Sequence, residues 1–290
     1  MLVQPERNEM SITKVMPCAA AALTAALFFG LGAGASAACL PAPPDLVSSG
    51  ELTIGTALTA PPMGFMDDGK PTGFDPDLAS ALAEKMCLKP KFVNLAFQGL
   101  FPGLISKKFD IISSQVGITE TRKKQFDFLP VFKGGLRLVT QKGSGIRFKT
   151  EADVCGHPVA LAAGTSQMAA LERIKDECPK DKPMTMKIFS SQIEALNEVA
   201  KKAVDAAYVD WPVAAYLIKQ RPNDFVEASP VLSGDGPGTP RHLNGIVFRK
   251  SEDATNAAVA ASLKAVEADG TYDKILTKWN LAEGDIRKND

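Results

Sequence analysis

Three consecutive cations, Arg122, Lys123 and Lys124, stand at the start of an expected helix that Thr119 opens. The start of a helix carries a partial positive charge, so a cation there is unfavourable by about 0.3–1 kcal/mol unless an anion lies nearby. Arg122 suits an anionic ligand, because its planar guanidinium can hold a carboxylate through two parallel hydrogen bonds. The alternative is that both lysines are solvated and that Arg122 pairs with a surface carboxylate.

Asp210 offers the opposite charge at a comparable position. It follows an expected strand that ends at Val209, and it precedes Pro212, which suits the first turn of a helix. Two roles are open for its carboxylate: capping that helix, or holding an ammonium group of a ligand. An arginine and an aspartate at strand ends of separate domains would together suit a zwitterion.

A second candidate for anion binding is the segment AGTSQ at residues 163–167. Here a strand turns through Gly164 into a helix, whose unpaired amides and the hydroxyls of Thr165 and Ser166 would form an anion pocket. Ordinary capping of the helix by Thr165 or Ser166 is the alternative.

Two series of alternating strands and helices must position these residues. In the first series, strands are expected at residues 51–56, 91–94 and 109–113, and helices at 76–86 and 100–106. In the second series, strands are expected at 158–162, 186–189 and 205–209, and helices that end near 177, 201 and 219. This alternation predicts an α/β fold with parallel sheets wrapped by helices, where ligands lie beyond the carboxyl ends of the strands. The residues at such ends, which are expected to face one crevice, are Asn94, Phe97, Gln98, Ser114 to Gly117 and Arg122.

The bulk properties exclude several classes of function. A chain of 290 residues can form two domains with sizeable cores. Lys plus Arg and Asp plus Glu both number 33, and no strongly basic run occurs, so a nucleic-acid partner is not expected. Five cysteines and two histidines, without a CxxC pair or a ligand-spaced cluster, predict neither a metal site nor a cofactor.

The N-terminal segment predicts export. After Lys14, residues 18–38 form an uncharged run rich in Ala and Leu that ends in small residues, a pattern typical of a signal peptide over residues 1–38. A retained membrane anchor is one alternative. Another is acylation of Cys39, because residues 36–39 loosely resemble a lipoprotein box; Met10 is a candidate start of translation.

Four cysteines remain after such a cleavage. They are Cys39, Cys87, Cys155 and Cys178, and an even number in an oxidising compartment predicts two disulfides. Three pairings are possible. The order along the chain favours Cys39 with Cys87 and Cys155 with Cys178, each within one expected domain.

Six motifs, in this order, make the chain resemble a known family. They are GFDPDLA (73–79), FQGLFPGL (97–104), DIISSQVGITETR (110–122), AGTSQ (163–167), VDAAYVD (204–210) and DGTYDKILTKW (269–279). Over residues 51–281 the chain resembles the bacterial periplasmic amino-acid-binding proteins of ABC importers, the family 3 solute-binding proteins. The resemblance implies a monomeric periplasmic protein that delivers an amino acid to a membrane permease.

The resemblance also implies a two-lobed periplasmic-binding-protein fold. Two doubly wound α/β domains would be joined by hinge crossovers near residues 135–141 and 243–249, and the ligand would be trapped when the lobes close. Lobe 1 would comprise residues 39–136 and 246–290, and lobe 2 residues 137–245.

Roles for individual residues follow from the same resemblance. Arg122 would hold the α-carboxylate, assisted by the Gly117 amide and by Thr165 and Ser166. Asp210 would hold the α-amino group. The side-chain pocket would be lined by Phe97 and by the loop at residues 60–65, which ends at Phe65.

Three positions depart from the family pattern. Relatives often have an aromatic residue where Ala60 stands, a small residue where Gln115 stands, and Ser or Thr where Gly117 stands. A less apolar pocket with one extra amide is therefore expected, suited to polar, uncharged or modified amino acids. No spare acidic residue in these motifs marks a cationic ligand.

Two other functions use the same fold. A few relatives dehydrate cyclic amino-acid precursors, which requires a positioned acid or base. Of Asp75, Glu120 and Asp210, only Asp210 is expected to point inward, and no Ser-His-Asp arrangement is visible, so catalysis is not expected. A module that presents its closed form to a membrane receptor would bind its ligand identically.

Overall fold

The computed structural model describes residues 38–236 and 240–288, so the expected signal peptide lies, except for Ala38, outside the described residues. From Cys39 onward the described strands form two five-stranded sheets and one three-stranded sheet. In this part of the chain, no helix is both long and apolar enough to span a bilayer.

The first sheet has the strand order β5-β1-β6-β13-β7. These strands are Lys89–Asn94, Glu51–Thr56, Ile111–Gly117, Leu243–Arg249 and Phe126–Lys133. β5, β1 and β6 are parallel, whereas β13 is antiparallel to both β6 and β7. The sequence did not predict β7, which contains Pro130; an edge strand tolerates the missing amide of a proline.

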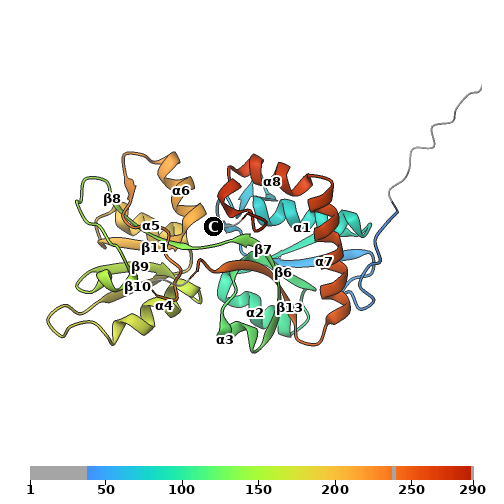
Figure 1. The fold of residues 1–290 in the computed structure, drawn as a ribbon, viewed down its shortest axis with the longest axis horizontal. Helices are drawn as coiled ribbons and strands as arrows, with labels where there is room; N and C mark the ends of the chain where they lie inside the picture. The colour runs from blue at the N-terminus through green and yellow to red at the C-terminus, as the bar shows by residue number, and fades with distance from the viewer. Residues whose placement is uncertain (1–37, 237–239, 289–290) are drawn as a thin grey trace, which may run out of the picture. The chain divides into compact units, whose positions relative to one another are not determined.

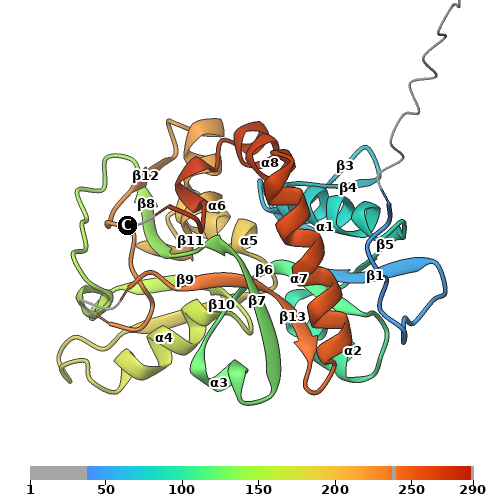
Figure 2. The same ribbon diagram turned by 45° about the vertical axis from the view of Figure 1, so that its right-hand side comes forward.

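Helices cover both faces of this sheet. Helices α1 (Phe74–Lys85), α7 (Asp253–Ala268) and α8 (Thr271–Trp279) pack together on one face, as Figure 2 shows, and α2 (Phe97–Ile105) packs on the other. The short helix α3 (Glu120–Lys123) precedes β7. Leu78 and Leu82 of α1 are fully buried at helical spacing, which gives α1 one apolar face towards the sheet.

The second sheet has the order β10-β9-β11-β8-β12. These strands are Thr185–Phe189, Pro158–Ala162, Ala206–Asp210, Leu136–Gln141 and Phe225–Glu227; the first three are parallel, and β8 is antiparallel to both its neighbours. Helix α4 (Ser166–Lys175) and the 3₁₀ turn η1 (Glu151–Val154) pack on one face, and α5 (Gln192–Ala200) and α6 (Trp211–Gln220) on the other. Helices on both faces of both sheets confirm the predicted doubly wound α/β fold.

We refer to the first sheet and its helices as lobe 1, and to the second sheet and its helices as lobe 2. The third sheet extends from lobe 1 and consists of β2 (Thr59–Ala60), β3 (Gly64–Asp67) and β4 (Lys70–Thr72). Asp68 and Gly69 adopt φ of 45° and 76° between the paired residues Asp67 and Lys70, so a tight turn joins β3 and β4. The 3₁₀ turn η2 (Ala282–Gly284) follows α8.

Two connections join the lobes, and Figure 1 shows them passing between the two sheets. The first runs from β7 through Gly134 and Gly135 into β8, and the second returns the chain to β13. They lie together, because the amide of Gly134 donates to the carbonyl of His242 at 2.9 Å and the amide of Leu136 donates to that of Leu232 at 2.8 Å. The boundaries expected for the lobes stay a prediction; β8 begins at Leu136 and β13 at Leu243.

Both expected disulfides are confirmed. Cys39 is bonded to Cys87 and Cys155 to Cys178, with Cα atoms 5.5 and 5.4 Å apart. Each bond lies within one lobe. The Cys39 sulfur is taken by the disulfide, so it has no free thiol for acylation in this structure.

Candidate ligand-binding site

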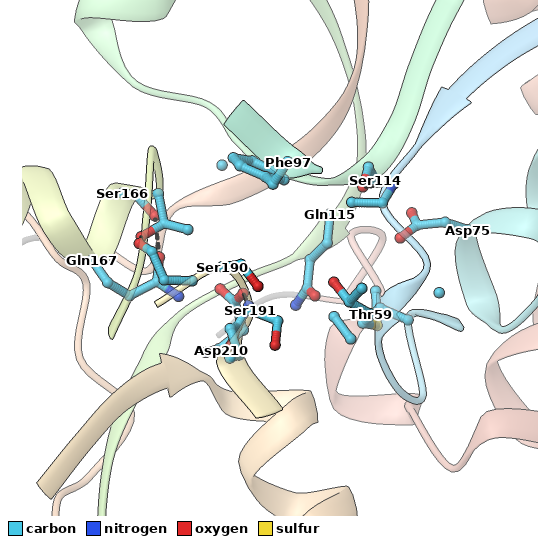
Figure 3. A pocket seen from close by; sticks show the side chains of 18 of the residues that line it. Thr59, Asp75, Phe97, Ser114, Gln115, Ser166, Gln167, Ser190, Ser191 and Asp210 are labelled. Carbon is cyan, nitrogen blue, oxygen red and sulfur yellow. Dashed lines mark hydrogen bonds between the residues drawn. The ribbon is translucent and has the colours of Figure 1, made fainter. Parts of the chain in front are cut away.

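A cavity lies between the two lobes and is lined by residues of both (Figure 3). It encloses about 40 Å³. Seven of the eight ligand-binding residues expected from the sequence line it: Phe97, Gln115, Gly117, Arg122, Thr165, Ser166 and Asp210. The cavity therefore brings together side chains that are far apart in the sequence.

Arg122 comes from α3 and crosses from one lobe to the other. Its guanidinium donates to the carbonyl of Gly117 at 2.7 Å and to that of Gly164, at the start of the α4 turn, at 3.0 Å. It also lies over the rings of Phe97 and Phe101, at 5.8 and 5.1 Å from their centroids. Burial lowers the pKa of Arg122 to about 10, and the negative charge of Asp210 opposes that shift.

Among the described residues, no carboxylate forms an ion pair with Arg122. The two neighbouring lysines differ from Arg122, since Lys123 and Lys124 are both exposed and Lys123 pairs with Glu120 at 2.7 Å. Arg122 is thus a guanidinium at the cavity between the lobes, where neutral carbonyl oxygens hold it.

Asp210 ends β11 and precedes α6, where it is 6% exposed. Its carboxylate makes no capping hydrogen bond to α6; it accepts instead from the side-chain amide of Gln192, whose carbonyl accepts from the Asp210 amide at 2.8 Å. Burial raises the pKa of Asp210, and the nearby His242 is the largest opposing influence. The side chain is therefore turned towards the cavity rather than towards its own helix.

Thr165 and Ser166 approach from the start of α4. The Thr165 hydroxyl accepts from the Met168 amide at 3.3 Å and donates to the carbonyl of Ala162 at 2.7 Å, so Thr165 caps α4 while lining the cavity. Gly117 lies against this helix start, because a Cβ at Gly117 would come within 3.4 Å of the Ser166 hydroxyl. The two lobes are in contact here.

Gln115 lies in an irregular part of β6. The pairing of β6 with β13 changes register here, and Gln115 adopts a left-handed φ of 49°. The buried Asn244 side chain of β13 donates to the carbonyl of Gln115 at 2.7 Å and holds this conformation. The Gln115 side chain points into the centre of the cavity (Figure 3).

Three residues expected at the cavity do not line it. The ring of Phe65 lies 5.8 Å from Trp279 and 6.5 Å from Tyr216, because alternate residues of β3 face opposite sides and Gly64 takes the cavity side. The side chain of Asn94 accepts from the Leu58 amide at 3.1 Å. Gln98 lies on α2, which begins at Phe97, three residues earlier than predicted.

Asp75 is the residue that sequence reasoning misplaced. It was expected not to point inward, yet its side chain lines the cavity and is only 4% exposed. Burial raises the pKa of Asp75 to about 7, although a hydrogen bond from the Gln115 amide lowers it. The cavity therefore holds a spare acidic residue, contrary to the expectation from the motifs.

The rest of the lining is polar and was not predicted. It includes Thr59, Ser114, Gln167, Ser190, Ser191 and Gln192. In the described part of the chain, no group of three or more His, Cys, Asp or Glu side chains is arranged to hold a metal ion. The chemistry available in the cavity is thus hydrogen bonding and charge pairing.

Comparisons with known proteins place the chain in a family. The sequence matches the bacterial extracellular solute-binding proteins, family 3, over residues 52–282. The L-cystine-binding protein TcyJ of Escherichia coli (strain K12) is 28% identical over 232 residues, which cover 79% of this chain and 82% of TcyJ. The ABC transporter arginine-binding protein 1 of the same strain is 29% identical over 231 residues, 79% of this chain and 90% of that protein.

A solved structure agrees with this placement. An ancestral arginine-binding protein bound to arginine is 35% identical and superimposes with a TM-score of 0.71, covering 79% of this chain and 98% of that one. These relatives are binding proteins, which confirms the expectation of a binding protein rather than an enzyme. The chain belongs to the bacterial extracellular solute-binding proteins of family 3.

Proposed function

We propose that this protein is the periplasmic substrate-binding component of an ABC importer and captures an amino acid between its two lobes. One observation carries the proposal: a guanidinium, Arg122, and a carboxylate, Asp210, line one cavity from opposite lobes. In the proposed complex, Arg122 holds the α-carboxylate with the amides near Gly117 and Ser166, and Asp210 holds the α-amino group.

The ligand enters while the lobes are apart. A cavity of 40 Å³ has room for only a few water molecules, at about 10–15 Å³ each, so an amino acid needs the lobes to open before it binds. The paired connections at Gly134 and His242 are the proposed hinge. The monomeric, closed protein then docks on a membrane permease.

The proposed location is the periplasm. Its relatives include periplasmic proteins, such as the lysine/arginine/ornithine-binding periplasmic protein of Escherichia coli (strain K12). Two disulfides suit an oxidising compartment. We propose that residues 1–38 are a cleaved signal peptide.

Isothermal titration calorimetry on the purified mature chain, after a thermal-shift screen of all amino acids, tests the proposal. A ligand at 100 times its Kd adds about 2.7 kcal/mol to the free energy of unfolding, which raises the melting temperature visibly. Arg122→Ala and Asp210→Ala should each weaken binding by about 2–5 kcal/mol, since each leaves a buried charged partner unpaired. Lys123→Ala, next to Arg122 but exposed, is the matched control and should bind normally.

Two results would contradict the proposal. One is wild-type affinity in both cavity variants. The other is turnover of a cyclic amino-acid precursor such as prephenate or arogenate without stable binding of any amino acid, which would favour the dehydratase alternative.

A further inference from the structure

Asp75 stands out among the buried acidic residues of the described chain because no positive group and no side-chain donor satisfies it. The equally buried Asp110 accepts hydrogen bonds from the Thr53 amide at 2.7 Å, from the Thr53 hydroxyl and from the Val47 amide at 2.7 Å. Buried Glu151 accepts from the Tyr208 hydroxyl and the Gly234 amide. Asp75 accepts only from the backbone amide of Gln115.

Its neighbour on the same helix turn shows the contrast. Asp77 lies two residues further along α1, on the opposite side, where it accepts from Lys278 at 2.7 Å and from the Trp279 indole at 2.8 Å. Both residues stand in the first turn of α1, where the helix dipole favours a negative charge. Asp77 pairs with Lys278 of the protein itself, whereas Asp75 faces the cavity.

Gln115 gives a second, independent sign of a ligand at this place. Its side chain is 91% buried, since its exposed fraction is 9%, and neither its amide nitrogen nor its carbonyl oxygen has a hydrogen-bond partner among the described residues. Buried amides are normally satisfied, and left-handed φ is unfavourable for a residue with a Cβ. A strained residue that carries an unsatisfied polar group into a cavity is typical of a binding site.

The charged residues of the cavity lining indicate which charge the ligand side chain must carry. Its lining contains three charged residues: Arg122 from α3, Asp210 from β11 and Asp75 from α1. The α-carboxylate and α-amino group of the proposed ligand neutralise the first two. The carboxylate of Asp75 is left to face the ligand side chain, and the negative charge of Asp210 contributes to its raised pKa.

From this placement we infer that Asp75 and Gln115 form a subsite for the ligand side chain, and that it selects amino acids whose side chain is cationic and donates N–H hydrogen bonds. The inference rests on the proposed function. An ammonium, guanidinium or imidazolium group pairs with the Asp75 carboxylate and donates to the Gln115 carbonyl oxygen. An acidic side chain meets two carboxylates, and an apolar one leaves both polar groups unsatisfied.

Matched ligand pairs test the subsite by calorimetry on the mature wild-type chain at pH 8. Lysine and norleucine have side chains of similar length that differ in the terminal ammonium. Lysine or arginine should bind at least tenfold more tightly than norleucine, glutamine and glutamate. Stronger binding of norleucine, glutamine or glutamate would overturn the inference and leave the proposed function standing, whereas failure of every amino acid to bind would remove the proposed function itself.

Asp75→Asn keeps the shape of the side chain and removes its charge. It should reduce the lysine-to-norleucine affinity ratio at least tenfold, while Asp77→Asn, which removes the same charge from the same helix turn outside the cavity, should leave the ratio unchanged. A second variant, Gln115→Leu, leaves Asp75 in place and tests the other half of the subsite. It should lower the lysine-to-norleucine affinity ratio at least threefold. Circular dichroism confirms the fold of each variant, and an unchanged ratio in folded Asp75→Asn or Gln115→Leu would overturn the inference.

Discussion

The indole ring of Trp211 stacks on the ring of Phe132, with centroids 5.8 Å apart and ring planes 15° apart. Trp211 begins α6 of lobe 2, yet it is packed into the hydrophobic core of lobe 1, and its indole N–H donates to the carbonyl of Lys133 at 3.1 Å. It directly follows Asp210. A movement of lobe 2 that brings Asp210 to a ligand must therefore be accommodated at this aromatic contact.

Ligand binding should change the fluorescence of Trp211. The chain has two tryptophans, and the other, Trp279, contacts Phe65 and Asp77, which belong to lobe 1 as Trp279 does. Trp211→Phe should therefore lose most of the ligand-induced change in emission, and Trp279→Phe should keep it. The reverse pattern in a fluorescence titration would show that the contact at Phe132 does not report closure.

The stability of the ligand-free protein should depend on pH through Asp75. Its pKa rises from 3.8 to about 7 on folding, so between these values the folded protein binds a proton that the unfolded chain lacks. The contribution of Asp75 to the free energy of unfolding is then largest below about pH 4 and is lost as the pH rises to 7. At about 1.36 kcal/mol per pKa unit, Asp75→Asn should be more stable than the wild type at pH 8 by up to roughly 4 kcal/mol.

Urea unfolding of both proteins between pH 4 and pH 8 measures this difference. The gain from Asp75→Asn should shrink towards pH 4, because the carboxyl of the unfolded wild-type chain also begins to bind a proton near its pKa of 3.8. A gain that stays constant over this range would mean that Asp75 does not titrate as described.

The affinity for a cationic ligand should have the opposite dependence on pH. Lysine binds the ionised form of Asp75, so below pH 7 binding must displace a proton, and affinity should fall by at most about tenfold per pH unit. Burial also raises the pKa of Asp210, so Asp75→Asn is the necessary comparison. Calorimetry at pH 8, 7, 6 and 5 should show that the affinity of the variant for lysine depends less steeply on pH than that of the wild type. An equal dependence in both proteins would assign the effect to another group.

Asn244 should affect binding without lining the cavity. Its side chain holds the carbonyl of Gln115 at 2.7 Å, and Asn244→Ala leaves that buried oxygen unsatisfied, a loss of about 1–3 kcal/mol. Both the free energy of unfolding and the affinity should fall. Asn197→Ala, which breaks a hydrogen bond with Arg221 on lobe 2, is the control for an effect on stability alone. Normal affinity in Asn244→Ala would show that the hydrogen bond from Asn244 does not hold Gln115 in place.

The disulfide between Cys155 and Cys178 should matter for stability rather than for binding. The two cysteines are 23 residues apart, and removing a cross-link of this length costs about 3 kcal/mol when the unfolded chain gains the corresponding freedom. The double variant Cys155→Ala, Cys178→Ala should unfold at lower urea concentration. Neither cysteine lines the cavity, so ligand affinity of the folded variant should stay within about twofold; a larger loss would contradict a structural role.

The sequence was sufficient for the fold class, the order of most elements and the pairing of the cysteines. Arg122 and Asp210 could be found because each is a charged residue that follows a predicted strand within a recognisable motif. Phe65 could not be placed, since a strand of four residues gives too short a pattern to show which alternate positions face inward. β7 was missed because Pro130 reads as a break in a strand unless its edge position is known.

Asp75 was missed for a different physical reason. An acid in the first turn of a helix is common, because the helix dipole favours it, so Asp75 and Asp77 looked equivalent. Yet Asp75 is spaced by three and seven residues from Leu78 and Leu82, the apolar face of α1, and Asp77 is not. That spacing was the available signal, whereas the register shift that turns Gln115 into the cavity depends on β13, more than a hundred residues later.

The position of β13 between β6 and β7 has a consequence for biosynthesis. All strands of lobe 2 precede β13 in the chain, so a nascent chain that has emerged from the ribosome as far as Glu227 contains a complete second sheet but a first sheet with a gap. Lobe 2 can therefore begin folding while the nascent chain still grows, and lobe 1 must wait for its last segment. Limited proteolysis of a purified chain that ends before Leu243 should leave residues of lobe 2 protected and those of lobe 1 accessible.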